Sequence, residues 1–261
     1  MDEDDDRGGA IGAGARAILR WSVSRRTPDD VWAAAWLRSA RSVRRDESRG
    51  GPGARGDPVM TGGRALERGT SWTPRVIQPM RPTPAAPFHR PGWIYEEKYD
   101  GWRVLAYKQG ATVRLRSRHG RDCTGRFRAL AAAIASLPTA ALILDGEVAV
   151  FDEHLRSRLD FLRCPAPLAL VTPPMYITFD CVYARGRDLR AYALGVRREV
   201  LETLIDGQQL LLPARRLPAH GLDAWAEVQR RGYEGLVAKD ESSAYRGGLT
   251  RSWLKVKRRH G

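Results

Sequence analysis

Short strand-like runs follow one another closely from residue 93 to the end of the chain. Helical patterns interrupt them at about 126–136, 196–206 and 221–231. Hairpin-like strands with helices between them favour an α+β fold, with antiparallel sheets flanked by helices, over a doubly wound parallel sheet. Neither G-x-G-x-x-G nor G-x-x-x-x-G-K-[ST] occurs, so Rossmann and P-loop nucleotide sites are not supported. The expected strands cover 93–98, 102–107, 112–117, 142–145, 148–151, 175–183, 210–212, 235–239 and 253–257.

Residues 1–75 differ in composition from the rest of the chain and begin with an acidic run. An N-terminal cap signal predicts a helix around 29–41. We expect the segment as a whole to be a basic, low-complexity and largely disordered arm, or an upstream sequence without a role, with Met60 and Met80 as alternative starts. Residues 76–261 are expected to form one folded domain.

The chain is strongly basic, with 44 Lys and Arg against 30 Asp and Glu and a formal net charge of +14. The arm has 14 arginines against 11 acidic residues, so +11 of this charge belongs to the remainder. Such an excess indicates nucleic acid or nucleotides as partners. Without an apolar run of about 18 residues or a basic signal-peptide start, we expect a cytoplasmic, nucleoid-associated protein with no membrane contact. Three cysteines without C-x-x-C spacing indicate neither a disulfide framework nor a zinc site.

Lysine is rare in this chain, which has five lysines and 39 arginines. Arginine stays protonated in proteins, whereas lysine can lose its proton and become a nucleophile. Lys98 closes one expected strand, ahead of a glycine turn, where it can be held rigidly. An ordinary lysine has a pKa of about 10.4, so an amine that is neutral at pH 7 needs cations and a metal around it. The alternative is an ion pair between Lys98 and Asp100 in a hairpin.

The motif around Lys98, E-E-K-Y-D-G-W-R at 96–103, resembles the K-x-D-G motif of the ATP-dependent DNA ligase family, within the covalent nucleotidyltransferases. Further segments resemble the other motifs of that family in the same order, and the likeness covers about 80–261. It is greatest to bacterial end-joining and accessory ligases. The further segments are S-R-H-G at 117–120, L-D-G-E at 144–147, Y-I-T-F-D at 176–180, E-G-L-V-A-K at 234–239 and W-L-K-V-K at 253–257.

The resemblance implies an adenylation domain with the nucleotidyltransferase (ATP-grasp-like) fold. It implies that Lys98 attacks the α-phosphate of ATP, forms a lysine-linked AMP and passes the AMP to a DNA 5′-phosphate for strand joining in repair or recombination. Glu96 would accept a hydrogen bond from the adenine amino group, and Phe179 would stack on the base. Without the resemblance, a phenylalanine in an apolar strand is ordinarily a core residue.

The same resemblance implies a Mg²⁺ site at Glu147 and Glu234, with Asp145 as an alternative to Glu147. A strand carboxylate that faces solvent is the plainer interpretation of either glutamate. Asp100 would fix the turn and the lysine rather than bind metal, and His119 would be a loop residue rather than a general base.

The remaining basic motif residues are implied in binding phosphate groups. Lys239, Lys255 and Lys257 would neutralise the triphosphate, and alternation puts Lys255 and Lys257 on one face of their strand. Arg103 and Arg118 would contact the ribose, the phosphate or the DNA end. The alternative for the lysines is that they protect a solvated edge strand from aggregation.

Family members usually continue into an OB-fold domain, which is expected to be absent here because the sequence ends at Gly261. Strand sealing would then need a separate OB-domain chain or repair protein, or the arm as a DNA clamp. Two other functions stay open at this stage. One is an RNA ligase or a capping-type guanylyltransferase with the same lysine motif, and the other is a non-catalytic nucleic-acid-binding remnant.

Overall fold

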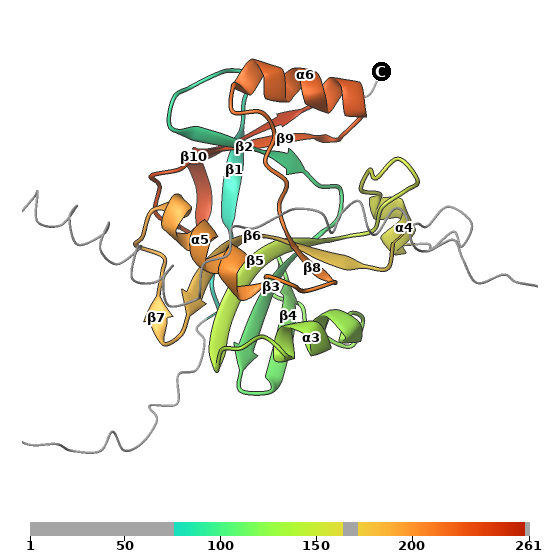
Figure 1. The fold of residues 1–261 in the computed structure, drawn as a ribbon, viewed down its shortest axis with the longest axis vertical. Helices are drawn as coiled ribbons and strands as arrows, with labels where there is room; N and C mark the ends of the chain where they lie inside the picture. The colour runs from blue at the N-terminus through green and yellow to red at the C-terminus, as the bar shows by residue number, and fades with distance from the viewer. Residues whose placement is uncertain (1–75, 164–171, 259–261) are drawn as a thin grey trace, which may run out of the picture.

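The structure, a computed structural model, describes residues 76–163 and 172–258. The expectations for the arm 1–75 and its helix, and for Cys164, lie outside the described residues. Figure 1 shows two β-sheets one above the other with helices at both ends of the molecule. The elements are β1 (Met80–Pro84), β2 (Trp93–Lys98), β3 (Trp102–Gln109), β4 (Thr112–Ser117), α3 (Arg128–Ala135), β5 (Ala141–Ala149), α4 (Leu159–Arg163), β6 (Met175–Ala184), β7 (Arg187–Asp188), α5 (Leu194–Leu204), β8 (Leu211–Pro213), α6 (Gly221–Arg231), β9 (Gly235–Asp240) and β10 (Gly248–Lys257).

The smaller sheet has four strands in the order β1-β10-β9-β2. Alternate residues of its strands are apolar on one face, and this face packs against α6 (Figure 1). Helix α6 buries Gly221, Ala224 and Val228, which recur at helical spacing on one side. Strand β1 was not expected from the sequence, because its segment, M-R-P-T-P, contains two prolines and only one large apolar residue.

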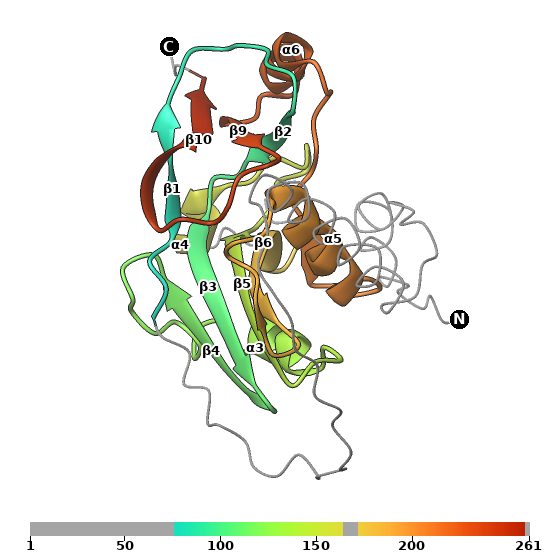
Figure 2. The same cartoon turned by 90° about the vertical axis from the view of Figure 1, so that its left-hand side faces the viewer.

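The larger sheet has the strand order β4-β3-β5-β6-β7, and β8 pairs with β6. One face packs against α3 and α5 in the largest hydrophobic core of the described residues. The other face turns toward the smaller sheet, and a second core of Met80, Leu105, Tyr107, Tyr245 and Trp253 joins the two sheets with further apolar residues. Figure 2 shows the smaller sheet standing over the long strands β3, β4 and β5.

The α+β expectation is confirmed, but three details differ. The sheets are not purely antiparallel, because β1 pairs with β10 and β8 with β6 in parallel. The run 142–145 and the first two residues of the run 148–151 form one strand, β5, and the irregularity lies in its neighbour β6, where the register shifts. Strands β2 and β3 do not form a hairpin, since each belongs to a different sheet. The segment after Lys98 therefore connects the two sheets.

The glycine of the D-G-E segment is required by the approach of the next strand. A Cβ atom on Gly146 would lie 2.6 Å from the Ile177 carbonyl oxygen and 2.6 Å from a ring carbon of Tyr176. Tyr176 cannot move aside easily, because its hydroxyl donates to the carbonyls of Val104 and Leu144. In the ranges 76–163 and 172–258, no helix has the length and apolar character needed to cross a bilayer.

Candidate active site

One face of the smaller sheet collects most of the charged motif residues. In the antiparallel ladders, Lys98 lies opposite Gly235, which lies opposite Lys257. Glu96 lies in the same way opposite Val237. Because directly opposite residues share a face of a sheet, their side chains point to the same side, toward the larger sheet. This face carries Glu96 and Lys98 from β2, Lys239 from β9, and Trp253, Lys255 and Lys257 from β10.

Lys98 is the last residue of β2, and its ammonium is held by a carboxylate. Its Nζ lies 2.5 Å from Oε2 of Glu234, and the other oxygen of Glu234 lies 2.9 Å from Nζ of Lys257. Burial alone would raise the pKa of Glu234, but Lys98 and Lys257 outweigh it and hold this pKa below its usual value. The alternative pair of Lys98 with Asp100 is wrong, because Asp100 instead accepts the backbone N–H of Leu159 at 3.2 Å.

The carboxyl group of Glu147, in the larger sheet, interacts electrostatically with Lys98. Glu147 lies in β5 opposite Arg103 of β3. Burial raises the pKa of Glu147 to about 8, although Arg103 and Lys98 act to lower it, and Glu234 adds a smaller repulsion. Lys98 is therefore within electrostatic reach of two carboxyl groups from different sheets.

Asp145, the alternative metal ligand, is already bound on both oxygens. Arg103 donates from Nε to Oδ1 at 2.8 Å and from Nη2 to Oδ2 at 2.6 Å. The hydroxyl of Tyr245 donates to Oδ2 at 2.5 Å. Asp145 is fully buried. In 76–163 and 172–258, no group of three or more His, Cys, Asp or Glu side chains could hold a metal ion.

Arg103 reaches across between the sheets. Besides Asp145, its Nη2 donates to the carbonyl of Met80 at 2.9 Å. Its guanidinium lies 4.8 Å from the centre of the Phe179 ring. Phe179 is half-buried and packs edge-on against Trp253, with ring centres 5.9 Å apart. Phe179 is thus a partly exposed ring beside cations rather than an enclosed core residue.

Glu96 and Lys239 are buried together in an ion pair, Lys239 donating to Oε2 of Glu96. Arg198 of α5 lies 3.4 Å from Oε1 of Glu96, but Oε1 accepts no hydrogen bond from any described residue. The Lys239 ammonium lies 4.5 Å from the Phe179 ring centre and 4.3 Å from that of Trp253. Burial and Arg198 lower the pKa of Lys239, against the attraction of Glu96.

Three predicted residues lie at the margin of this arrangement. Lys257 is exposed but shares Glu234 with Lys98, and Lys255 is half-buried on the same face of β10. Arg118 is exposed in the loop after β4, where its Nε lies 2.9 Å from Nε2 of His119. The backbone N–H of Arg118 donates to the carbonyl of Arg103 at 3.1 Å, which places the backbone of Arg118 next to the site.

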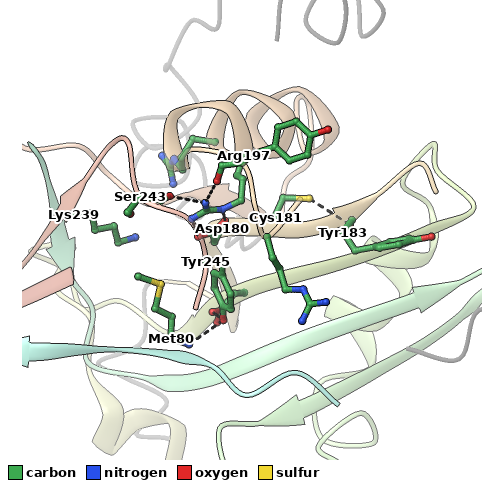
Figure 3. Close-up of polar contacts among 12 residues, drawn as sticks. Met80, Asp180, Cys181, Tyr183, Arg197, Lys239, Ser243 and Tyr245 are labelled. Carbon is green, nitrogen blue, oxygen red and sulfur yellow. Dashed lines mark hydrogen bonds and ion pairs between the residues drawn. The ribbon is translucent and has the colours of Figure 1, made fainter. Parts of the chain in front are cut away.

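Sequence reasoning missed the buried arginines behind the site. Figure 3 shows Arg197 of α5 pointing at Asp180, the residue after Phe179, and at the carbonyl of Ser243. Arg197 and its neighbour Arg198 are fully buried. Their burial could have been predicted from their position, because both arginines fall on the apolar side of the predicted helix 196–206. Arg197 ties the loop after β9 to β6, and Arg198 ties Glu96 to α5.

Comparisons with known proteins agree on one family. A model described as "ATP dependent DNA ligase domain" matches residues 79–257. The "Multifunctional non-homologous end joining protein LigD" of Pseudomonas aeruginosa is 32% identical over 245 residues, which cover 93% of this chain and 28% of that protein. A "Probable DNA ligase" of Beutenbergia cavernae is 32% identical over 204 residues, covering 71% of this chain and 40% of that protein.

Solved structures give the same result for the fold. The structure titled "mycobacterial DNA ligase D complexed with ATP and MES" superposes with a TM-score of 0.61 at 32% identity, and the match covers 69% of this chain and 60% of that one. The chain spans only about a quarter of the length of the LigD relatives, 28% of the Pseudomonas protein and 21% of the Mycolicibacterium smegmatis protein.

Proposed function

Because this chain belongs to the ATP-dependent DNA ligase family, we propose that Lys98 takes AMP from ATP and passes it to the 5′-phosphate of a broken DNA strand. One observation supports this more than any other. The Lys98 amine stands at a strand end with the carboxylate of Glu234 at 2.5 Å and with Glu147 in electrostatic reach, on the sheet face that also carries Lys239, Lys255 and Lys257. A nucleophile, two carboxylates and a set of cations are the groups that transfer of a nucleotidyl group requires.

The proposed reaction has three steps, and Lys98 acts in the first two. Its neutral amine attacks the α-phosphorus of ATP, an N–P bond forms, the bond to the β-phosphate oxygen breaks, and pyrophosphate leaves while the amine gives a proton to solvent. An oxygen of the DNA 5′-phosphate then attacks the same phosphorus, the N–P bond breaks and Lys98 regains a proton. In the third step, attack by a DNA 3′-hydroxyl expels AMP and closes the strand.

We propose that the base of the nucleotide binds beside Glu96. Oε1 of Glu96 is buried and has Arg198 at 3.4 Å, but it accepts no hydrogen bond from the described residues. A buried acceptor without a hydrogen-bond donor is costly. An exocyclic amino group such as that of adenine would supply the missing donor. The half-buried ring of Phe179 would stack on the base. Lys239, now held by Glu96, would exchange this partner for a phosphate oxygen.

Glu147 and Glu234 are the residues proposed to hold Mg²⁺. Magnesium takes few protein carboxylates and keeps several waters, so two side chains suffice. The raised pKa of Glu147, about 8, fits this role because its carboxylate lacks enough positive charge around it. The ion would polarise the phosphate and favour the neutral form of Lys98. Lys255 and Lys257 would offset the charge of the β- and γ-phosphates, and Arg103 and Arg118 would contact the ribose, the phosphate or the DNA end.

The whole reaction of this protein is proposed as strand joining in DNA repair, as the name of the LigD relatives suggests. The substrate would be a nicked or broken duplex, and the place of action the nucleoid. Besides DNA, an OB-domain chain or a repair protein is proposed as a partner in sealing. Residues 76–261 are proposed as the domain that does the adenylation.

The experiment compares Lys98→Arg with the control Lys108→Arg. Lys108 is the one lysine of this chain that has no role in the proposed site. Lys108 is buried near the end of β3, and its amine donates to the carbonyls of Ala135 at 2.5 Å and Leu137 at 2.6 Å. Each protein is incubated with labelled ATP or GTP and Mg²⁺, and covalent label is measured on a denaturing gel. Wild type and Lys108→Arg should take label from ATP, whereas Lys98→Arg should lose it at least 1000-fold, since a guanidinium stays protonated.

Two results would contradict the proposal. Label that persists in Lys98→Arg would place the nucleophile elsewhere. Label from GTP but not from ATP would assign the protein to capping chemistry. A labelled wild-type protein that is then chased with a nicked duplex should return the label as adenylated DNA, and transfer to an RNA end alone would exclude DNA as the substrate.

A further inference from the structure

Strand β4 carries a row of arginines that ends at the candidate active site. In the β3–β4 ladder, Arg114 lies opposite Tyr107 and Arg116 opposite Leu105. Arg118, the next residue in this alternation, bonds through its backbone N–H to the carbonyl of Arg103. Residues opposite one another share a face of the sheet. The three arginines therefore lie on the face that carries Arg103 and Glu147, and the row leads from the edge of the sheet to the site.

In the part of the chain that the structure describes, no carboxylate forms an ion pair with the arginines of this row. Within the described residues, no hydrogen bond or ion pair involves the side chain of Arg114, which is exposed. Arg116 donates only to the carbonyl of Gly120, at 3.3 Å. Asp122 lies across an isolated bridge from Arg116, but its carboxylate accepts the backbone N–H of Thr124 at 2.9 Å and pairs with no arginine within 4.0 Å. The pKa of Asp122 is lowered mainly by its hydrogen bonds with Thr124 and also by the charges of Arg116 and Arg114.

Several arginines on other surfaces are paired, although the exposed Arg128 and Arg251 have no ion pair or side-chain hydrogen bond with a described residue. Arg190 is held by Asp188 at 2.5 Å, and Arg230 and Arg231 of α6 are both held by Glu227. In an ion pair, the carboxylate offsets the charge of the guanidinium and occupies some of its donors. An exposed guanidinium without such a pair can use its charge and its five N–H donors to bind a ligand. The row on β4 is thus available to an anion.

Protection of a sheet edge is the plainer explanation for charged residues on a strand such as β4. It does not account for Arg116, because the edge is already covered there. Residues 121–123 run back along β4, where Ser117 donates its backbone N–H to the Arg121 carbonyl at 2.9 Å and Cys123 donates to the Leu115 carbonyl at 2.9 Å. This end of the edge is already covered by the chain itself.

We propose that Arg114 and Arg116 bind backbone phosphates of duplex DNA that runs along β4, starting from the candidate active site near Arg118. Alternate residues of a strand are about 6.6 Å apart, close to the advance of two phosphates along one DNA strand. Arginine suits phosphate through its planar fork of donors. This inference rests on the proposed function and extends it, by assigning a duplex-binding surface outside the motif residues.

The test is equilibrium binding of a nicked DNA duplex to the full chain at salt concentrations from 50 to 200 mM. Arg114→Gln/Arg116→Gln is compared with Arg190→Gln/Arg230→Gln, which removes the same charge from paired positions. Each lost phosphate contact lowers the slope of log K against log salt by about 0.9, or about 3.5-fold in affinity over this range. The β4 variant should bind more weakly than wild type at 50 mM salt, and its slope should be smaller by about 2, so that its affinity falls about 12-fold less than that of wild type between 50 and 200 mM. The control should match wild type.

Covalent labelling with ATP, which needs no DNA, serves as the check on folding and should be equal in all three proteins. If the β4 variant labels normally and binds the duplex like the control, the inference is wrong. If it loses affinity for duplex RNA but not for DNA, the assignment to DNA is wrong. Should the wild type take no label while the β4 variant still binds DNA more weakly than the control, the proposed chemistry fails and the DNA surface stands.

Discussion

Single residues at the site have environments that their motifs alone do not specify. Glu147 and Glu234 have the same predicted role, but the pKa of Glu147 is raised to about 8 and that of Glu234 is lowered. The difference arises because Glu234 directly contacts two lysines, which stabilise its ionised form, whereas for Glu147 the cost of burial exceeds the attraction of Arg103 and Lys98. A proton that Glu147 keeps in the folded state links stability to pH.

We expect the folded protein without metal to lose stability as the pH rises. Between about pH 4.5 and 8 the unfolded chain releases a proton that Glu147 keeps when folded, so the free energy of unfolding falls with pH over this range and levels off above it. Glu147→Gln should remove this part of the slope and raise the free energy of unfolding at pH 8 by on the order of 2 kcal/mol. Urea unfolding at pH 5.5 and pH 8 measures both.

Part of the slope should remain in this variant, because burial also raises the pKa of Glu97, to about 7, against the attraction of Arg215. Glu97 lies on the opposite face of β2, away from the site. Glu97 also makes the free energy of unfolding fall as the pH rises, and this part of the slope should be equal in wild type and Glu147→Gln. An identical pH slope in wild type and Glu147→Gln would show that Glu147 is ionised in the folded protein.

The residue types at the site could be predicted from the sequence, but their partners could not. Lysine is rare in this chain, so Lys98, Lys239, Lys255 and Lys257 were visible as a pattern. The pairing of Lys239 with Glu96, 143 positions apart, depends on how β2 and β9 align. Likewise, Tyr245 and Asp145 meet across 100 residues. Contacts at such separation have no local signal in a single sequence.

At the scale of elements, the period-2 alternation located most strands, and the prediction failed where tertiary packing decides. Helix α6 lies at 221–231 as expected, whereas β5 is one strand where two were expected. The hairpin that the alternative Lys98–Asp100 ion pair implied does not form, because β2 and β3 belong to different sheets and their apolar faces pack in different cores. At Gly146, which lies between the two expected runs, β6 passes too close for a side chain.

Replacement of this glycine tests the close approach. Gly146→Ala should lower the free energy of unfolding by about 2–3 kcal/mol, since the added methyl would overlap a backbone carbonyl and a ring that is held in place. Gly125→Ala is the matched control, because a Cβ there meets no atom within 4 Å. It should change stability by less than about 0.5 kcal/mol or stabilise slightly. Equal effects of the two substitutions in urea unfolding would contradict the packing of β5 against β6.

At the scale of the whole molecule, the first described strand ties the two sheets together. β1 pairs with β10, and the Met80 carbonyl accepts from Arg103 of the larger sheet. The backbone N–H of Met80 donates to the hydroxyl of Tyr245 at 3.1 Å, and Tyr245 in turn holds Asp145. The proposed domain boundary near residue 76 therefore falls just before a strand on which the site depends.

Truncation tests this boundary. A chain that starts at residue 76 should keep its covalent labelling with ATP and unfold within a few degrees of the full chain, because it retains β1. A chain that starts at residue 86 lacks β1, so Arg103 and Tyr245, which hold the buried Asp145, lose their hydrogen bonds to Met80. It should label at least 10-fold less and unfold at a lower temperature. If both truncated chains behave alike, β1 does not support the site.

The central claim is that the amine of Lys98 becomes bonded to phosphorus. The most direct measurement is mass spectrometry of the peptide that contains Lys98, after the purified full chain has been treated with ATP and Mg²⁺ and digested. We expect an adduct of the mass of AMP on Lys98, which disappears when excess pyrophosphate is added and reverses the step. A folded protein that binds ATP but returns this peptide unmodified, or that carries the adduct on another lysine, would contradict the account.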